Sequence, residues 1–577
     1  MKPYFDTMDP FGKSLKPGRI KRAAASATAL REIEAGIGEA VTAAHEVGFP
    51  TEKINKRGWM TVYQRLEYLV DAGTWCPLHT LYNPLENEEG TTNVVDGVGQ
   101  IDGRWAVVIG FDNKVMAGAW LPGQSENILR ATDLAARLHI PLVWLVNCSG
   151  AKLPEQEKFY ANRRGAGTPF YRHAELEQAG IPVLAGIYGT NPAGGGYQSI
   201  SPTILLAHKD ANMAVGGVGI VSGMAPKGGF DTAMVEELIA KANEFTGRPP
   251  GDVATHHDAT GFFTRVYDEE TGVLDGLKDY MRAMPAYGST FFQAADPKDP
   301  AFPIDDLYHL LPANPKEVYD FDEILARLVD GSERLEFRPD DGPEVFTGVC
   351  KIDGRLVGCI GNRQGYLGKG YPEYADYPGM GGKLYRQGLI KMNEFVTLCG
   401  RDRLPIIWFQ DTSGIDVGEL AEKAEVLGLG QGLIYSIQQT DVPMMLVVLR
   451  KGTAAAHYVM GGPTANRHNA FSLGTPATEI EVMHGETAAV ATYARRAAKE
   501  QAAGRSLDPI IEKMNALVER YHETSRPAYC AQQGFVDEVV KLTELRRYLQ
   551  AFTGAVYQNP TSICPRHHML LPRVIRG

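Results

Sequence analysis

Four short runs of small residues are the parts of this sequence best suited to chemistry. They are Asn147–Lys152 (N-C-S-G-A-K), Thr190–Tyr197 (T-N-P-A-G-G-G-Y), Asp411–Asp416 (D-T-S-G-I-D) and Arg450–Tyr458 (R-K-G-T-A-A-A-H-Y), named below the Ser149, Gly195, Ser413 and Ala455 turns. Glycine and alanine let two backbone segments approach closely, so that N–H groups from both can converge on one oxygen atom. Such donors stabilise the negative charge of a thioester enolate without any proton transfer. For one turn alone, tight packing of a helix against a strand explains the small residues equally well.

The elements that position these turns are short apolar strands. Ile140–Val146 and Val442–Leu449 are far shorter than the about 18 apolar residues of a membrane span, and Pro, Asn or Arg bounds them. Runs of this kind predict buried parallel strands. Because ligands bind beyond the carboxyl ends of such strands, the turns stand where a site is expected.

The sequence contains the same pattern twice, in the same order. Three pairs of segments match: Gly97–Arg104 with Gly348–Arg355, Ile140–Gly150 with Leu404–Gly414, and Ala179–Val183 with Thr440–Met444. The first pair carries I-D-G-R, and Asp-Gly is a strong signal for a two-residue hairpin turn. Residues with helical spacing follow from Glu126 and from Lys383. We therefore expect a duplicated α/β domain with a mostly parallel sheet.

Length and net charge limit the possible domain organisation and function of the chain. The 577 residues exceed the roughly 250–300 at which single cores stop growing, so at least two domains are expected. We place an N-terminal helical arm at 1–90, a first domain at 91–325 and a second at 326–577, with a linker around Asp296–Pro315 rich in Pro and Asp. The net charge of -11 argues against nonspecific nucleic-acid binding.

No metal site or export signal is expected. His256-His257 and His567-His568 lack further ligands at a fitting spacing, which predicts packed or solvated histidines. The seven cysteines are scattered without a C-x-x-C pair and are interpreted as reduced thiols. Since no long apolar segment occurs, we expect a cytoplasmic protein.

Taken together, the four turns resemble the carboxyltransferase subunits of biotin-dependent acyl-CoA carboxylases and decarboxylases. The resemblance covers nearly the whole chain, and it is greatest to the members that act on glutaconyl-CoA. It implies an α/β fold with two tandem crotonase-like (ClpP/crotonase) spiral domains and an N-terminal helical arm.

The sequence departs from the family pattern at three of the turns. The family usually reads S-G-G-A-R and A-G-G-A-Y in its first domain, and D-x-P-G-F and R-K-A-Y-G-G-A-Y in its second. Here 149–152 has one Gly fewer, 412–415 lacks the Pro, and Ala454–Ala456 is followed by an inserted His457. Every position stays small, but the choice between neighbouring amides is left open.

The resemblance also implies the role of each turn. Ala151 with Gly195 or Gly196 would hold the thioester oxygen of the acyl-CoA, and Ile415 with Ala455 or Ala456 would hold the ureido oxygen of biotin. Further contacts to the CoA thioester or biotin are expected from Ser149, Gly150, Lys152, Gly194, Gly414, Ala454, Arg450 and Lys451. Lys152, Arg163 and Arg164 either meet CoA phosphates or lie on an exposed helix face.

The biotin is expected on another subunit. A biotin attachment lysine needs a sequence close to Met-Lys-Met at a hairpin tip, and Lys391, the nearest approach, lies in an amphipathic helical pattern where we expect a surface lysine. The implied partners are glutaconyl-CoA and crotonyl-CoA, a biotin carrier subunit and an integral-membrane carboxybiotin decarboxylase subunit that drives sodium export. They would hold the protein at the inner face of the membrane.

Three other functions compete with this expectation. Carboxyltransferases for 3-methylcrotonyl-CoA or propionyl-CoA need the same turns, so spacing does not separate them. A crotonase-type hydratase needs only one oxyanion hole, and a non-catalytic scaffold need not keep small residues at all four turns. Because the reaction needs both holes to face each other, we also expect a homodimer, or a higher oligomer, whose sites pair the first domain of one chain with the second domain of the other.

Overall fold

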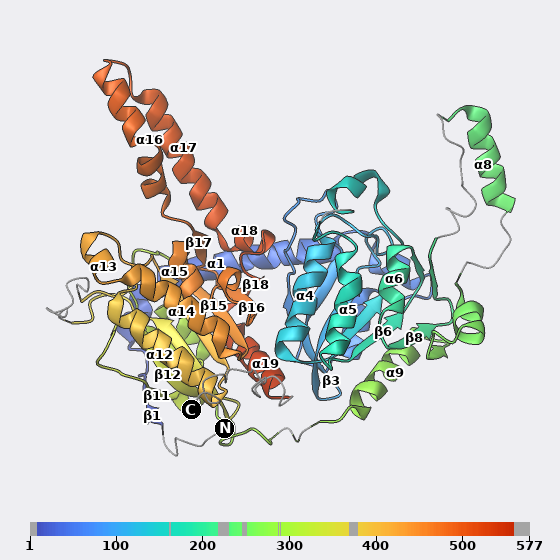
Figure 1. Cartoon of the computed structure of the whole chain (residues 1–577), viewed down its shortest axis with the longest axis horizontal. Helices are drawn as coiled ribbons and strands as arrows, with labels where there is room; N and C mark the ends of the chain where they lie inside the picture. The colour runs from blue at the N-terminus through green and yellow to red at the C-terminus, as the bar shows by residue number, and fades with distance from the viewer. Residues whose placement is uncertain are drawn as a thin grey trace, which may run out of the picture. The chain divides into compact units, whose positions relative to one another are not determined.

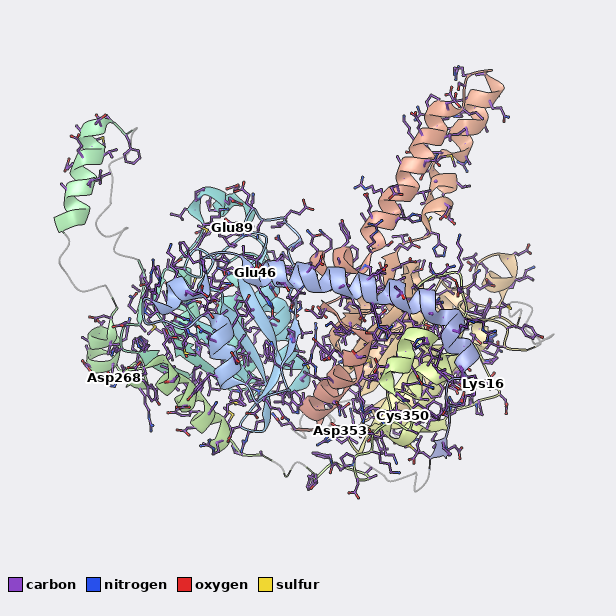
Figure 2. The ribbon with its side chains drawn as sticks, turned by 180° about the vertical axis from the view of Figure 1, so that it is seen from behind. Lys16, Glu46, Glu89, Asp268, Cys350 and Asp353 are labelled. Atoms are coloured by element: carbon purple, nitrogen blue, oxygen red, sulfur yellow. The ribbon has the colours of Figure 1, made fainter. Side chains whose placement is uncertain are left out.

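The fold is seen in a computed structural model of the chain, which describes residues 8–160, 163–216, 230–244, 251–286, 288, 290–368 and 379–558. The chain forms two compact units (Figure 1). Val41–Ala286 makes one of them, here the continuous unit, and Met1–Ala40 together with Tyr287–Gly577 makes the other, the split unit. Helix α1 (Pro17–Glu46) crosses the division; Lys16 precedes its first residue and Glu46 is its last (Figure 2). The N-terminal region is therefore helical, as predicted.

The described part of the continuous unit is built on a seven-stranded sheet in the order β10-β8-β6-β5-β4-β3-β2. Its strands are β2 (Cys76–Leu78), β3 (Val94–Ile101), β4 (Arg104–Phe111), β5 (Leu142–Val146), β6 (Val183–Ile187), β8 (Ile204–His208) and β10 (Arg265–Tyr267). The strands from β4 to β10 run parallel, and β2, β3 and β4 are antiparallel neighbours. A separate parallel pair joins β7 (Thr190–Pro192) to β9 (Asn212–Ala214).

Helices cover both faces of this sheet. They are α2 (Thr51–Asn55), α3 (Val62–Leu69), α4 (Gln124–Leu138), α5 (Thr168–Gln178), α6 (Gly194–Ile200) and α9 (Glu270–Ala283). The unit also contains α8 (Thr232–Glu244), which does not cover the sheet (Figure 1). A buried core joins α3 and α9 to alternate residues of the strands, such as Val108, Val143 and Leu184. Residues of the opposite parity, including Trp144, face α4 and α5. The apolar runs are thus buried on both faces, as parallel strands require.

The split unit repeats the strand order. Its sheet runs β1-β11-β12-β13-β14-β15-β16-β18, and β17 also pairs with β15. The strands are β1 (Asp9–Pro10), β11 (Glu333–Glu336), β12 (Val345–Ile352), β13 (Arg355–Asn362), β14 (Ile406–Thr412), β15 (Met444–Thr453), β16 (Asn469–Gly474), β17 (Glu479–Glu481) and β18 (Glu538–Val539). An antiparallel hairpin followed by parallel strands therefore occurs in both units, as β3–β4–β5–β6–β8 and as β12–β13–β14–β15–β16.

The helices of the split unit include a pair that extends away from its sheet. These two, α16 (Gly485–Ala502) and α17 (Asp508–Ser525), pack on each other (Figure 1). The others that follow α1 are α10 (Leu307–Leu310), α11 (Phe321–Leu325), α12 (Arg386–Asp402), α13 (Glu419–Lys423), α14 (Val426–Thr440), α15 (Ala454–Val459), α18 (Pro527–Gln532) and α19 (Leu545–Gln558).

Both predicted Asp-Gly hairpin turns are confirmed. Asp102-Gly103 and Asp353-Gly354 have positive φ at both residues, which is the geometry of a type I′ turn. Figure 2 labels Asp353. Each turn is held by one further carboxylate in the same way: Asp71 accepts from the N–H groups of residues 102 and 103 at 3.1 and 2.7 Å, and Asp330 accepts from those of 353 and 354 at the same distances.

Two local expectations need correction. The helix expected from Lys383 begins at Arg386, because Leu384 is engaged in a parallel β-bridge with Ile415. The segment Asp296–Pro315, expected to be a linker, contains helix α10, whose Leu307, Tyr308 and Leu310 are buried.

Candidate active site

The Ser149 turn follows β5 and returns toward a neighbouring loop. The N–H of Trp120 donates to the carbonyl of Gly150 at 2.7 Å, and the N–H of Lys152 donates to the carbonyl of Trp120 at 3.0 Å. These bonds form a parallel bridge that holds Ala151 between them. Gly150 has φ +108°, a conformation that a side chain would strain, while Ala151 itself is exposed. The turn is therefore fixed in place with its small residue open to solvent.

The Gly195 turn packs directly against the Ser149 turn. A Cβ added at Gly195 would lie 2.7 Å from the carbonyl oxygen of Cys148, and one at Gly196 would lie 2.7 Å from the carbonyl oxygen of Ala214. Gly194 has room, because its added Cβ would come no closer than 3.7 Å, to Phe170. Two of the three consecutive glycines are thus required by close backbone approach.

The Ser413 turn repeats the geometry of the Ser149 turn. The N–H of Leu384 donates to the carbonyl of Gly414 at 3.0 Å, and the N–H of Asp416 donates to the carbonyl of Leu384 at 2.9 Å, with Ile415 between them. Gly414 has φ +136°. A Cβ built on it would meet no described atom within 4 Å, so the turn borders open space.

The Ala455 turn matches the Gly195 turn at one unusual residue. Ala193 and Ala454 have φ of +50° and +51°, which is uncommon for a residue with a side chain. Counting from these two, Gly195 corresponds to Ala456. Ala455 is exposed and Ala456 is buried. Each unit therefore brings one strand-end turn and one helix-start turn together at the carboxyl end of its parallel strands.

Two buried amide side chains link the turns, and sequence reasoning missed both. Asn191 and Gln410 are fully buried, and each forms hydrogen bonds to the partner turn in its unit. Both stand inside or next to the motifs noted in the sequence. Their residue type alone gave no sign that they would point inward.

Arg450 lies in a buried ion pair. Its Nε lies 2.8 Å from Oδ2 of Asp411, both side chains are 2% exposed, and its Nη1 donates to the carbonyls of Asn314 and Glu317 at 3.2 and 2.7 Å. The guanidinium is thus committed to groups of the protein. Asp411 also accepts from the N–H of Lys451 at 3.1 Å, which fixes the start of the Ala455 turn against the Ser413 turn.

Lys152 is paired on the surface of the continuous unit. Its ammonium group forms ion pairs with Glu89 and Glu155, and the hydrogen bonds that it donates to Glu155 and then to Glu89 raise the pKa of Lys152 above its ordinary value. Figure 2 labels Glu89. A contact from Lys152 to CoA stays a prediction.

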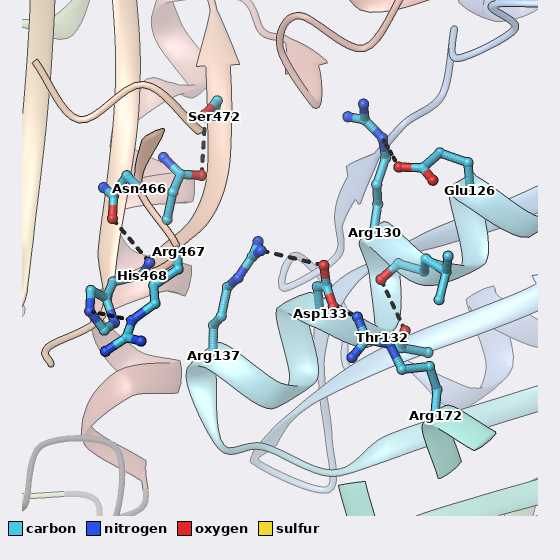
Figure 3. Close-up of polar contacts among 12 residues, drawn as sticks. Glu126, Arg130, Thr132, Asp133, Arg137, Arg172, Asn466, Arg467, His468 and Ser472 are labelled. Atoms are coloured by element: carbon cyan, nitrogen blue, oxygen red, sulfur yellow. Dashed lines mark hydrogen bonds and ion pairs between the residues drawn. The ribbon is translucent and has the colours of Figure 1, made fainter. Parts of the chain in front are cut away.

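The arginines near α4 also have acidic partners. Arg164 meets Glu126 at 2.6 Å, and Glu126 lies 3.8 Å from Arg130. Figure 3 shows the pair of Glu126 and Arg130 and the contacts of Asp133 with Arg137 and Arg172. The figure also shows the polar side of the loop that leads to β16, where the N–H of His468 donates to Asn466.

Lys391 is not the surface lysine that the sequence predicts. Its side chain is fully buried, and its Nζ donates to the carbonyl of Val345 at 2.9 Å. Burial lowers the pKa of Lys391 to about 8. Helix α12 is covered on this side by β12 and by Glu344, which the apolar pattern alone did not reveal. A buried lysine is even less available for biotin than a surface one.

Neither metal ligation nor a membrane span is found in the described residues. They contain no group of three His, Cys, Asp or Glu side chains placed to hold an ion. His256 contacts the carbonyl of Met213, and His257 contacts Asp258; His567-His568 lies outside the described ranges. Within those ranges no helix is both long and apolar enough to cross a bilayer.

Comparison with known proteins places the chain in a family. Residues 53–571 match the model described as the carboxyl transferase domain. The chain belongs to the carboxyl transferase domain family. It is 56% identical over 577 residues to the glutaconyl-CoA decarboxylase subunit alpha of Acidaminococcus fermentans, covering 99% of this chain and 97% of that protein. The methylmalonyl-CoA decarboxylase subunit alpha of Propionigenium modestum is 24% identical, over 87% of this chain and 91% of that one.

A solved structure of the same fold supports the architecture. The geranyl-CoA carboxylase beta subunit of P. aeruginosa superposes with a TM-score of 0.75 at 22% sequence identity, covering 97% of this chain and 99% of that one. The predicted α/β carboxyltransferase fold is thereby confirmed, and so is the assignment of the chain to the carboxyltransferases and decarboxylases.

Proposed function

We propose that this carboxyltransferase moves the terminal carboxyl group of glutaconyl-CoA to biotin and releases crotonyl-CoA. In this reaction the bond between the carboxyl carbon and its neighbour breaks, and the electron pair spreads to the thioester oxygen as a dienolate. The carbon that lost the carboxyl group then takes a proton, and the biotin nitrogen releases its N–H proton as it accepts the carboxyl group. Preorganised N–H groups hold the charge on the thioester oxygen in the transition state.

One observation carries the proposal: the two units present the same pair of turns. Ala151 and Ile415 occupy matching β-bridges, and Ala193 and Ala454 share the same positive φ. A hydratase would have no use for the second pair. We assign the thioester oxygen to the amides of Ala151 and Gly195 or Gly196. The correspondence of Gly195 with Ala456 supports Gly195.

The second pair of turns would hold biotin. Biotin supplies the nitrogen that accepts the carboxyl group, and its ureido oxygen would lie at the amides of Ile415 and Ala455 or Ala456. The open space beside Gly414 and the alanines at 454–456 fit a flat ureido ring. The Arg450–Asp411 pair would hold these turns in place without touching the ring.

The partners follow from the same proposal. Several relatives are named as subunits, among them the alpha subunits of glutaconyl-CoA and methylmalonyl-CoA decarboxylases. We propose a biotin carrier subunit and a membrane subunit that consumes the carboxylated biotin, which would place this protein at the inner face of the membrane. Lys391, being buried, supports a biotin carried by another protein.

The test compares acyl groups, with free biotin as the acceptor for decarboxylation and carboxybiotin as the donor for carboxylation. Biotin-dependent loss of the carboxyl group from glutaconyl-CoA is expected to exceed, in kcat/KM, the carboxybiotin-dependent carboxylation of 3-methylcrotonyl-CoA or propionyl-CoA. A preference for 3-methylcrotonyl-CoA or propionyl-CoA would reject glutaconyl-CoA as the substrate. It would still agree with a mechanism that uses two oxyanion holes. Turnover of glutaconyl-CoA without biotin would reject carboxyl transfer. If no thioester reacted, the protein would instead be a non-catalytic scaffold.

The oligomer is tested separately. We propose a homodimer, or a higher oligomer, in which the thioester turns of one chain act with the biotin turns of another. Light scattering during size exclusion is expected to give at least twice the 63.0 kDa of one chain. An active monomer would contradict this arrangement.

A further inference from the structure

In each unit, one buried amide side chain forms hydrogen bonds that connect the two turns of the pair. It is Asn191 in the continuous unit and Gln410 in the split unit. We infer that these are positioning residues, Asn191 for the thioester hole and Gln410 for the biotin hole. The inference rests on the proposed two-hole function.

Asn191 joins the Gly195 turn, to which it belongs, to the Ser149 turn. Its Oδ1 accepts from the N–H of Cys148 at 2.7 Å, and its Nδ2 donates to the carbonyls of Tyr188 and Asn212, both at 3.0 Å. The side chain thus bonds to the strand-end turn, to the end of β6 and to β9. Because it is fully buried, water cannot replace these bonds if they are lost.

Gln410 makes the corresponding link from the other side. It stands on β14, just before the Ser413 turn, and its Nε2 donates to the carbonyls of Ala456 and His457, both at 3.3 Å. Its Oε1 lies 2.7 Å from Nδ1 of His457. Since the amide NH₂ already faces two carbonyls, Oε1 is the acceptor, and His457 must carry its proton on Nδ1.

The surroundings of His457 fit this link. A Cβ added at Gly452 would lie 2.9 Å from Oε1 of Gln410 and 3.0 Å from Nδ1 of His457, so glycine makes room for the hydrogen bond. Burial lowers the pKa of His457 to about 4, which keeps the imidazole neutral. In the continuous unit the position corresponding to His457 is Gly196. The two units therefore lock the same turn with different side chains.

Accurate placement of the turns matters because hole donors act over a narrow range. They must lie about 2.7–3.1 Å from the oxygen, and a displacement of about 1 Å can cost roughly 100-fold in rate. A link between two turns of one unit sets the spacing of the donors in that unit alone. Loss of either link should therefore affect one substrate and spare the other.

The experiment uses Asn191→Asp and Gln410→Glu in the full chain, each serving as the control for the other. At position 410 a carboxylate keeps the shape and the acceptor but cannot donate to the carbonyls of Ala456 and His457. We expect Q410E to lower kcat/KM for biotin by about 10- to 100-fold and to leave KM for glutaconyl-CoA within about 2-fold. N191D keeps the bond from the N–H of Cys148 but cannot donate to the carbonyls of Tyr188 and Asn212, so the Gly195 turn loses its attachment to the end of β6 and to β9. It is therefore expected to do the reverse, lowering kcat/KM for glutaconyl-CoA and leaving KM for biotin within about 2-fold.

Gly452→Ala guards against misfolding caused by a buried charge. Its φ is not in the left-handed region, so the added methyl group displaces Gln410 without straining the backbone. It should reproduce the biotin effect of Q410E. Nitrogen NMR of His457 should show the Nδ1–H tautomer in the wild type, its loss in G452A, where Gln410 is displaced, and its retention in Q410E, whose carboxylate still accepts from Nδ1. A merely stabilising residue would not separate the two variants in this way.

Some results would overturn the inference. Equal effects of Q410E and N191D on both substrates would do so, and so would an unchanged kcat/KM for biotin in folded Q410E and G452A. Failure of the proposed function looks different, because the wild type itself would then lack biotin-dependent turnover. The tautomer of His457 would still report whether Gln410 links the two turns.

Discussion

Gly195 and Ala456 occupy corresponding places in the two units, yet only one of them must be glycine. The backbone of Cys148 lies against Gly195, whereas Ala456 carries its methyl group within the buried core. The Gly195 turn is therefore packed more tightly than the Ala455 turn. A substitution that one of these turns tolerates is therefore not expected to be tolerated at the corresponding position of the other.

Gly195→Ala is predicted to lower kcat/KM for the acyl-CoA by about 100-fold, the scale of losing one hole donor. The reason is the 2.7 Å approach of the new methyl group to the carbonyl oxygen of Cys148. Steady-state decarboxylation with saturating biotin measures the effect. Gly194→Ala is the matched control, since its nearest atom is 3.7 Å away, and it should change kcat/KM by less than about 3-fold. Equal losses in both variants would contradict the packing argument.

Lys391 predicts a dependence of stability on pH. Burial lowers its pKa from 10.5 to about 8, so between these values the unfolded chain binds more protons than the folded one. The stability contributed by this residue therefore rises as pH increases from 8 to 10.5, and below pH 8 the cost of the buried charge is fully present. Lys391→Met should remove that rise and cost little at pH 7, because the buried charge disappears.

Differential scanning fluorimetry of wild type and K391M from pH 7 to 10 checks this prediction. The difference in Tm, wild type minus variant, should move in favour of the wild type as pH increases. A constant difference would show that Lys391 is not protonated differently in the folded chain.

At the scale of elements, the duplicated hairpins show how the same turn meets different neighbours. Gly103 has no described atom within 4 Å of an added Cβ, whereas a Cβ at Gly354 would lie 2.0 Å from the carbonyl oxygen of Ala295. Both have positive φ, so alanine is strained at either position. Only the second turn is also closed by packing.

Gly103→Ala is predicted to cost about 1–2 kcal/mol in the free energy of unfolding, the strain of a left-handed residue. Gly354→Ala should cost about 3 kcal/mol or more, because overpacking adds to the strain. Urea denaturation followed by tryptophan fluorescence compares the two. If both variants lose the same stability, the contact with Ala295 does not restrain the turn.

The sequence was informative where local chemistry decides the structure. Asp-Gly turns, apolar parallel strands and small-residue turns depend mainly on residues that are adjacent in the sequence. Each was therefore predicted from a short run of residues. The inward direction of Lys391, Gln410 and Asn191 was not predicted, since it depends on which elements pack around them. The start of α12 was misplaced for the same reason: the bridge of Leu384 to Ile415 joins parts of the chain that no local pattern connects.

At the scale of the whole molecule, the chain forms one unit from a single stretch and the other from two. Residues that precede the continuous unit pack with residues that follow it: β1 pairs with β11 through Asp9 and Arg334, and Glu34 of α1 accepts from the N–H of Leu542. No boundary based on sequence repeats reveals this, because the first part of α1 lies outside the repeat.

This division has a consequence for synthesis on the ribosome. The apolar side of α1, with Ala27, Leu30 and Ile37, leaves the exit tunnel long before Tyr308, Ala313 and Leu542, which form hydrogen bonds with α1, are translated. Residues 41–286 can fold meanwhile, since domains fold as units while the chain grows. We predict that limited proteolysis of stalled nascent chains ending near residue 330 yields a protected fragment that starts near residue 41. A protected fragment that begins at the N-terminus would contradict this. With the predicted pattern, α1 exposes its apolar side during translation and is a binding site for chaperones.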